Sequence, residues 1–238
     1  MSRSFFIDTT ICIGCRGCQV SCKQWHDLPG EKTINRGTHE NPPDLSFDTY
    51  KLVRMREQVI NGKLNWLFFP EQCRHCLEAP CLETAGDSSA IYRDEETGAI
   101  IFTEETKNLD ADEIIESCPY NIPRQGPDGE LAKCDMCIDR IKNNMLPACV
   151  KTCPTGAMNF GERDQMLELA EKRLRVARLV RPEAVLIDSE DVCVIYLTAH
   201  SPDLYHENAV AVKSSGITRY AALQRLTRPI SSIFSRRM

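Results

Sequence analysis

The sequence predicts an α+β fold in which two small cysteine-rich modules are intertwined, one inserted into the other, and are followed by a C-terminal extension of helix and strand. Two observations support this class. Eleven of the 13 cysteines fall into three groups, two of them at the ends of a long intervening segment and one inside it. After Gly161 only one cysteine remains, and an amphipathic helical pattern is followed by short apolar runs. These features indicate short strands and helices around cysteine loops rather than two domains in series.

Length and charge exclude several classes of protein. A chain of 238 residues can bury a sizeable core, and its net charge of -5 argues against nucleic-acid binding. No segment approaches the roughly 18 consecutive apolar residues of a membrane span, so we expect none. The N-terminal run MSRSFFIDTTICIGC has too short an apolar stretch for a signal peptide. Taken alone, the sequence therefore predicts a cytoplasmic protein without its own export signal.

The first cysteine group lies in ICIGCRGCQVSCK, with two, two and three residues between successive cysteines. This is the run with which bacterial ferredoxins bind [4Fe-4S] clusters, except that Lys23 stands where the simple motif has proline. Three of its thiolates hold one cluster, and the fourth reaches a different cluster. A zinc site normally takes two C-x2-C pairs, so a third thiolate between them would be surplus. The spacing therefore favours iron and sulfide over zinc.

Two further groups resemble this motif but are split. The segment CRHCLEAPC has three cysteines and then Ala85 where the fourth is expected. The segment from Cys134 to Pro154 has a pair, a gap of eleven residues and a closing C-x3-C-P. Proline lacks an N–H and fixes its own φ, so it turns the chain after the last ligand.

Cys118 completes the site that lacks a fourth ligand. It is followed by Pro119, as at the end of a ferredoxin motif, yet the three upstream ligand positions are Asn108, Ala111 and Ile114. The loop at Cys73 has three ligands without a fourth, and Cys118 is a fourth without three. We therefore expect them to form one site, left after a fourth ancestral cluster was lost.

The exchange of the fourth ligand between clusters then assigns twelve cysteines to three [4Fe-4S] clusters. We name the predicted sites by their ligands: site 1 is Cys12, Cys15, Cys18 and Cys153; site 2 is Cys22, Cys134, Cys137 and Cys149; site 3 is Cys73, Cys76, Cys81 and Cys118.

Two other residues could compete as ligands. His75 lies inside the Cys73 loop, but such loops rarely use histidine, and we expect its side chain to face outward. Cys193 lies in DVCVIYL, a run rich in β-branched residues, so we expect it to be a small buried residue in a strand.

The cysteine pattern also sets the domain boundaries. Residues 1–30 and 125–162 are expected to form one module with two clusters, because their ligands interlock. Residues 31–124 are expected to form the inserted module with one cluster, and residues 163–238 the extension.

Local patterns predict the regular elements. FFIDTT, AIIFTEE and GAMNFG indicate short strands, and a helical turn is expected at Ala111–Ser117, ahead of Cys118. HENPPDLSFDTYK is proline-rich and is expected to be irregular.

The C-terminal extension has its own pattern. ERDQMLELAEKRLRVARLV predicts an amphipathic helix, followed by the strand-like runs AVLI and VCVIYL. From Ser214 the tail has five arginines and no acidic residue; we expect it to bind a partner subunit rather than a membrane surface.

The motifs ICIGCRGCQVSCKQW, FFPEQCRHCLEAPC, SCPYNIPR, KCDMCIDR and KTCPTGAMNFG resemble those of the iron–sulfur electron-transfer subunits of molybdenum and tungsten pterin oxidoreductases. Most members hold four clusters, whereas this sequence keeps the ligands of three. That departure, together with HENPPDLS and AEKRL before VIYL, is most similar to the small beta subunits of soluble periplasmic formate dehydrogenases from sulfate-reducing bacteria.

This resemblance implies a non-catalytic subunit that conducts electrons between a large catalytic subunit and an external acceptor. The catalytic subunit would hold a bis-pterin molybdenum or tungsten centre and its own cluster, and the acceptor could be a multihaem cytochrome c. It also implies a periplasmic protein exported already folded, on the signal of its partner.

One alternative keeps the electron-transfer role, and a second replaces it. The same electron-transfer role could serve a sulfur-compound, nitrite or sulfoxide reductase or a hydrogenase, since all use the same cluster motifs. A zinc-bound scaffold is the alternative from another class, and it would be colourless.

We predict that Cys118→Ser removes one cluster, or converts it to a three-iron form, and leaves the other two. Serine is nearly isosteric with cysteine, but its oxygen is a poorer iron ligand. Iron counting and low-temperature paramagnetic resonance would measure this, with Cys193→Ser as the matched control that should change nothing. A full set of four-iron clusters in Cys118→Ser would contradict the assignment.

Overall fold

The computed structural model describes residues 2–86 and 89–211. Its elements, in chain order, are β1 (Arg3–Asp8), η1 (Thr9–Ile11), α1 (Gly17–Trp25), β2 (Leu52–Ile60), β3 (Lys63–Glu71), α2 (Pro80–Ala85), β4 (Ile91–Arg93), β5 (Ile100–Phe102), η2 (Glu104–Asn108), α3 (Ala111–Ser117), β6 (Arg124–Gln125), β7 (Leu131–Ala132), α4 (Ile138–Lys142), α5 (Ala148–Lys151), β8 (Met158–Glu162), α6 (Arg163–Arg178), β9 (Val185–Ile187), β10 (Val194–Thr198) and η3 (Pro202–Leu204). The fold is thus a mixture of short helices and short strands, as expected.

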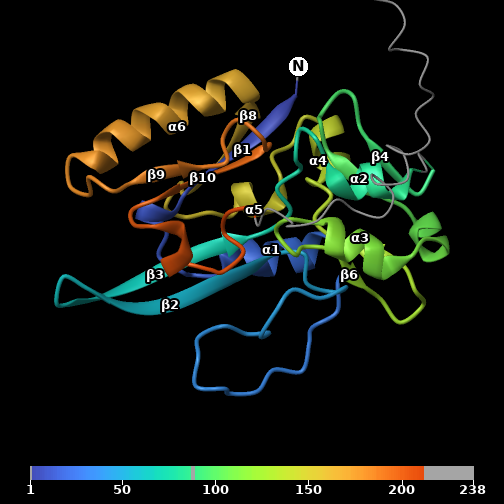
Figure 1. Cartoon of the computed structure of the whole chain (residues 1–238), viewed down its shortest axis with the longest axis horizontal. Helices are drawn as coiled ribbons and strands as arrows, with labels where there is room; N and C mark the ends of the chain where they lie inside the picture. Colours follow the sequence, from blue (N-terminus) through green and yellow to red (C-terminus); the bar gives the residue numbers. More distant parts are fainter. Residues whose placement is uncertain (1, 87–88, 212–238) are drawn as a thin grey trace, which may run out of the picture.

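Four of the described strands form one sheet in the order β8-β1-β10-β9 (Figure 1). β1 pairs antiparallel with β8, with Phe5 opposite Phe160, and parallel with β10, with Phe5 opposite Val194. The strands of the expected C-terminal extension therefore complete the same sheet as the N-terminal strand. A strand between two partners is fixed on both edges, which makes β1 the centre of this part of the fold.

The two faces of the sheet pack against different parts of the chain. Because side chains alternate along a strand, Phe6, Ile195 and Leu197 face α6 and pack against Ala170. The opposite face packs against the β2–β3 hairpin and the cysteine loops. Its residues Phe5, Ile7, Val194 and Tyr196 form one hydrophobic cluster with Cys18 and Cys149 of those loops. One face thus makes an aliphatic core with a helix, and the other supports the cysteine loops (Figure 1).

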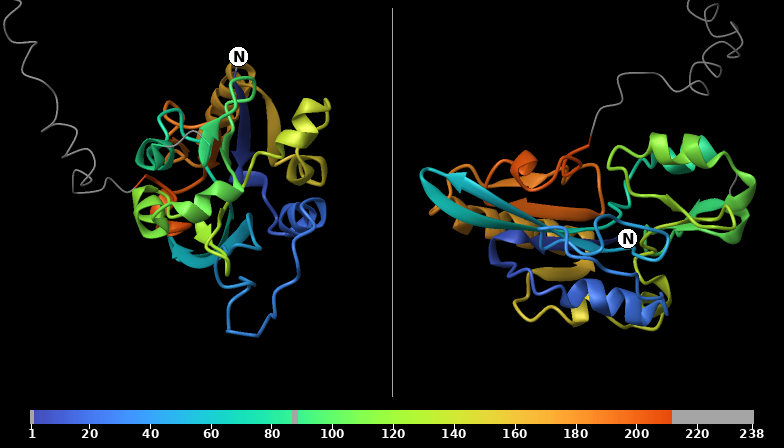
Figure 2. Two further views of the ribbon diagram at one scale, coloured as in Figure 1. Left: turned by 90° about the vertical axis from the view of Figure 1, so that its right-hand side faces the viewer. Right: turned by 90° about the horizontal axis from the view of Figure 1, so that it is seen from below.

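The β2–β3 hairpin was not expected from the sequence. Its two nine-residue strands are joined by Asn61 and Gly62, which both have positive φ (51° and 74°). An Asn-Gly pair with this backbone is the usual two-residue turn of a tight hairpin. The hairpin extends past the sheet, away from the region of α2, α3 and β4 at the other end of the molecule (Figures 1 and 2).

Several sequence predictions are confirmed. FFIDTT, AIIFTEE and GAMNFG contribute β1, β5 and β8, and the predicted helices are α3 and α6. Residues 39–51 have no helix and only the single bridge Ser46–Thr49. AVLI and VCVIYL contribute β9 and β10. The arginine tail falls outside the described residues. None of the described helices has the length and apolar character required to cross a membrane.

We predict that Ile195→Ala destabilises the protein by about 2–5 kcal/mol, because Ile195 is fully buried between the sheet and α6 and its truncation leaves a cavity. The matched control is Val176→Ala on α6, where the side chain is 59 % exposed; we expect a change within about 0.5 kcal/mol. Anaerobic denaturant unfolding of the cluster-loaded protein measures both. Equal effects of the two changes would show that this interface does not limit stability.

Candidate iron-sulfur sites

The four cysteines of site 1 line one pocket, together with Pro70, Ile13 and Gly14. Cys12 and Cys153 are separated by 140 residues in the sequence, and the pairing of β1 with β8 brings them together. Cys12 follows β1 and η1, Cys153 precedes β8, and β1 pairs with β8. Among the cysteines of the described residues, only Cys15 is exposed. Site 1 is therefore the site nearest to solvent.

Site 2 brings together Cys22 on α1 and three cysteines around α4 and α5. Burial raises the pKa of the Cys22 thiol well above its ordinary value, and the nearby sulfurs of Cys149 and Cys137 raise it further. Burial likewise raises the pKa of Cys134, with contributions from Cys22 and Cys137. All four thiols are buried, so the four expected ligands are electrostatic neighbours in the structure.

Site 3 joins the Cys73 loop to Cys118. Burial raises the pKa of Cys76, and the sulfurs of Cys73, Cys118 and Cys81 add to the rise. Cys118 is the C-cap of α3, so that helix delivers the thiol to the site. The structure thus brings together the two half-motifs that the sequence separates by 36 residues between Cys81 and Cys118.

Three of the four C-x2-C turns, all except Cys15–Cys18, share one backbone geometry. The residue before the second cysteine is Gly14, His75 or Met136, and each has a positive φ (64°, 47° and 67°). In two turns this residue donates its N–H to the first sulfur, His75 to Cys73 at 3.3 Å and Met136 to Cys134 at 3.4 Å. Amide donors aimed at sulfur stabilise a thiolate, so these turns fit ligands of an iron–sulfur cluster.

The first turn requires glycine for a further reason. A Cβ atom on Gly14 would lie 2.7 Å from the ring of Phe68 on β3, and the backbone there is left-handed. Any side chain would push the hairpin off the site 1 loop.

Packing places the sites in the order 1, 2, 3. Cys18 of site 1 and Cys149 of site 2 belong to one hydrophobic cluster. Cys134 of site 2 and Cys73 of site 3 belong to another. The thiols of site 2 therefore pack against those of both other sites.

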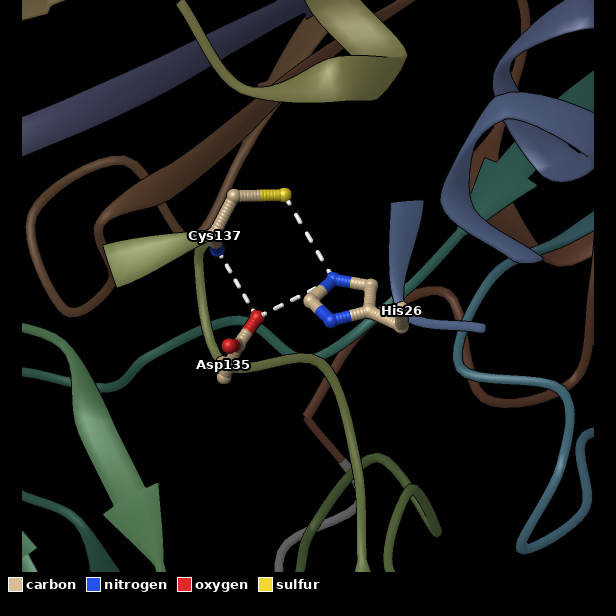
Figure 3. Close-up of side chains that lie close together, drawn as sticks. All are labelled: His26, Asp135 and Cys137. Atoms are coloured by element: carbon tan, nitrogen blue, oxygen red, sulfur yellow. Dashed lines mark hydrogen bonds and ion pairs between the residues drawn. The ribbon is translucent and has the colours of Figure 1, made fainter. Parts of the chain in front are cut away.

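His26 lies at the edge of site 2 (Figure 3). Its backbone N–H donates to the carbonyl of Cys22, and its Nε2 lies 3.5 Å from Cys137 Sγ and 3.4 Å from Asp135 Oδ1. Asp135 Oδ1 also accepts the N–H of Cys137 at 2.8 Å. The three ligand atoms lie within 4.8 Å of one another. Because Cys137 already belongs to site 2, His26 is placed to donate a hydrogen bond to its sulfur rather than to start a separate metal site.

The expectation that His75 faces outward is wrong. Its side chain is fully buried, and its Nδ1 accepts the N–H of Ile100 at 3.0 Å. The reason is that the buried end of β5 needs an acceptor, which this ring nitrogen supplies. Since Nδ1 is occupied, Nε2 carries the proton of the neutral ring, and His75 has no free lone pair for iron.

Cys193 is fully buried, as expected. It lies one residue before β10 rather than inside it, and its N–H donates to the carbonyls of Arg74 and His75. Its backbone thus fastens the site 3 loop to the central sheet, a role that depends on its main chain and not on its thiol.

Comparisons with known proteins agree with this geometry. Residues 64–163 match the family described as "4Fe-4S dicluster domain". The formate dehydrogenase subunit beta of Megalodesulfovibrio gigas is 56% identical over 215 residues, which cover 89% of this chain and 100% of that one. The chain belongs to the family of formate dehydrogenase beta subunits.

Other members of this family are also similar. The formate dehydrogenase 2 subunit beta (cytochrome c-553) of Nitratidesulfovibrio vulgaris is 51% identical and covers 88% of this chain and 99% of its own length. The nitrate-inducible formate dehydrogenase iron-sulfur subunit of Escherichia coli is 37% identical and covers 84% of this chain and 70% of its own length. The chain is thus an iron–sulfur protein.

In this beta-subunit homologue, aliphatic side chains occupy three of the four positions at which the sequence pattern would place ligands of a fourth cluster. Ile114 is 2% exposed, and Ala85 and Ala111 pack in the same hydrophobic cluster; Asn108 is exposed on the surface. An apolar core therefore stands where three of the four missing ligands would be, which excludes a fourth four-thiolate site there.

Three buried cations beside the sites were not expected from the sequence. Arg74 lies within 5.0 Å of the rings of Phe69, Tyr120 and Tyr196. Lys133 donates to the carbonyls of Ile100 and Cys134. Lys51 is 2% exposed. A lysine or arginine is almost never fully buried without a negative partner, and no motif marks such a residue in the sequence.

We predict that loading the metal-free chain with iron and sulfide releases protons and is favoured by rising pH. Burial raises the pKa of Cys12 to about 11 and of Cys81 and Cys137 to about 12, so these thiols are protonated near neutral pH. Iron binds the thiolate and must displace each proton. Anaerobic reconstitution at about pH 8.5 should therefore exceed that at about pH 6.5.

The control for this prediction is Cys193→Ser, which should release as many protons as the unchanged chain. Loading without proton release, or loading that is independent of pH, would contradict the prediction.

Proposed function

We propose that this chain holds three [4Fe-4S] clusters and conducts electrons between the catalytic subunit of a formate dehydrogenase and an external acceptor. The observation that carries the proposal is that the chain belongs to the formate dehydrogenase beta-subunit family. The four site 1 cysteines around one pocket support the ligand assignment. A [4Fe-4S] cluster carries one electron at a potential set by charge, hydrogen bonds to sulfur and exposure.

The ligand sets in this proposal are those of sites 1, 2 and 3: Cys12, Cys15, Cys18 and Cys153; Cys22, Cys134, Cys137 and Cys149; Cys73, Cys76, Cys81 and Cys118. The amide donors of the C-x2-C turns support them, because each favours a charged sulfur. The proposed modules follow: residues 1–30 with 125–162 hold sites 1 and 2, and the inserted residues 31–124 hold site 3. This division follows from the proposed ligands, because all four proposed ligands of site 3 come from the inserted segment.

The chain's own residues would position the clusters and shield them from water. Turns place the sulfurs, the hairpin covers site 1, and the aromatic and aliphatic packing excludes water from sites 2 and 3. None of these tasks needs an acid, base or nucleophile. The chemistry on formate would belong to the catalytic subunit and its bis-pterin molybdenum or tungsten centre.

The partners in this proposal are a large catalytic subunit with its own cluster and an acceptor such as a multihaem cytochrome c. The printed name of one relative includes cytochrome c-553, which supports a cytochrome as acceptor. We further propose that the chain works in the periplasm after export together with its folded partner. That route would deliver the clusters with their thiolates already occupied.

The alternative enzymes were sulfur-compound, nitrite and sulfoxide reductases and hydrogenases. The cluster loops alone suit all of them. Relatives that align over most of the chain at 56% and 51% identity favour formate dehydrogenase.

We predict that the chain co-purifies with a catalytic subunit and that the complex reduces a viologen dye with formate. Iron analysis of the isolated chain should give enough iron for three four-iron clusters and a brown colour that bleaches with dithionite. A complex that reduces the dye with hydrogen but not with formate would contradict the choice of enzyme. A colourless chain that contains zinc would contradict the cluster proposal itself.

A further inference from the structure

We propose that the imidazole of His26 donates a hydrogen bond to Cys137 Sγ, and that this bond raises the reduction potential of the cluster at site 2. The inference rests on the proposed function, because it requires a cluster at that site. It makes His26 a positioning residue of the electron path. The imidazole acts through a proposed ligand and does not bind iron itself.

Helix α1 brings both a proposed ligand and the donor to site 2. Cys22 lies in the helix and His26 is its C-cap, so the two residues are one helical turn apart. The N–H of His26 donates to the carbonyl of Cys22 at 3.1 Å, which fixes the backbone there. The side chain of His26 is 15% exposed, and its ring packs against that of Tyr50, with the ring centroids 5.5 Å apart. The imidazole is therefore held in place at the edge of site 2.

A neighbouring contact fixes the end of α1 against the start of α4. Trp25, the last residue of α1, donates its Nε1–H to Asp139 Oδ2 at 2.9 Å. The guanidinium carbon of Arg140 lies 4.0 Å from the centroid of the same indole ring. Asp139 and Arg140 belong to α4, and Cys137 is the N-cap of that helix. The residues next to His26 and Cys137 are thus joined to each other, which limits how far the imidazole can move from the sulfur.

Only the imidazole can supply the hydrogen of this contact in a loaded site. His26 Nε2 lies 3.5 Å from Cys137 Sγ and 3.4 Å from Asp135 Oδ1 (Figure 3). A cysteine bound to iron has lost its proton, and an ionised carboxylate only accepts. An unprotonated Nε2 would direct its lone pair at two acceptors, and they would repel it. The tautomer with hydrogen on Nε2 therefore fits this place, and its N–H is shared between the sulfur and the oxygen.

The hydrogen bond favours the reduced state of site 2. Reduction adds one electron and leaves the bonds to the ligands in place, so negative charge on the sulfurs increases. A donor to sulfur stabilises that charge, and hydrogen bonds to sulfur are among the factors that set the potential of a cluster. Asp135 acts in the opposite direction, because its negative charge repels the added electron and its oxygen takes part of the N–H of His26. His26 and Asp135 thus shift the potential of one site with opposite signs.

Site 1 offers a comparable contact. Thr155 Oγ1 lies 3.7 Å from Cys153 Sγ, so Thr155→Val should lower the potential of site 1 and leave site 2 unchanged. Local hydrogen bonds predict effects that are confined to one cluster each. A general loosening of the fold would instead shift all three potentials.

The test is a redox titration of the cluster-loaded chain with dithionite, followed by low-temperature paramagnetic resonance. His26→Phe removes the donor and keeps a ring, whereas His26→Gln places an amide N–H near the position of Nε2. Asp135→Asn removes the opposing charge. His39→Phe, at an exposed histidine, is the matched control. The signals of sites 1 and 3 are identified by their change in Cys15→Ser and Cys118→Ser, which leaves the remaining signal for site 2.

We expect the potential of site 2 to fall in His26→Phe, to rise in Asp135→Asn and to stay near its original value in His26→Gln. Sites 1 and 3 should keep their potentials in these variants, and His39→Phe should change none. Histidine labelled with a nitrogen isotope in its ring gives a second readout. Pulsed paramagnetic resonance of the reduced chain should detect a coupling of the ring nitrogen to site 2 that is absent in His26→Phe.

Three results would overturn the inference. They are an unmoved site 2 potential in a fully loaded His26→Phe, an equal fall at all three sites, and a fall in His26→Gln as large as that in His26→Phe.

Iron content is measured first, so that loss of a cluster is told apart from a shift in potential. An unchanged chain that never holds clusters refutes the proposed function, which is a different result from a failure of this inference. If His26→Phe lacks iron at site 2 while His26→Gln loads it at an unmoved potential, the donor is needed for assembly as well, and the inference stands. If both variants lack iron there, the imidazole is required as a ligand or for its shape, and the inference is wrong.

Discussion

The pairing of β1 with both β8 and β10 is the interaction on which the rest of this structure depends. It joins segments separated by more than 150 residues, and both cysteine-bearing ends of the sheet take their positions from it. The N–H of Asp8 donates to Ala157 at 2.8 Å, which draws the loops of Cys12 and Cys153 together. On the other edge, the residue before β10 hydrogen-bonds to the Cys73 loop. One short strand thus sets the distance between loops that no local interaction could bring together.

The proposed cysteine groups could be derived from sequence alone, because the motifs have fixed spacings and a missing member shows up, as Ala85 and Cys118 illustrate. The sequence also predicted α6 and the strand segments, whose periodicity depends on residues close in the chain. The hairpin was not predicted, although the pair Asn61-Gly62 is a typical signal for a two-residue turn. His75 and Lys51 could not be placed from sequence, since their burial results from contacts with Ile100, Pro70 and other residues far along the chain.

The distribution of charge inside the protein is opposite to that of the whole chain. The net charge is -5, yet the side chains buried beside the sulfurs are cationic: Lys51, Arg74 and Lys133. The acidic residue that is most deeply buried, Glu71, is neutralised by Arg54 at 2.6 Å and approached by His206 at 3.0 Å. A positively charged interior stabilises anionic groups. The net charge of the whole chain does not reveal this. Charge and packing in the core therefore serve the same sites.

The aliphatic packing around Ile114 opposes the gain of a fourth cluster by single substitutions. A further four-thiolate site here would require several thiols at once, whereas mutation supplies them one at a time. A lone cysteine at Ile114 would gain no ligand partner, and it would leave a smaller side chain in a tightly packed core. Each single substitution toward such a site would thus lower stability without creating a binding site.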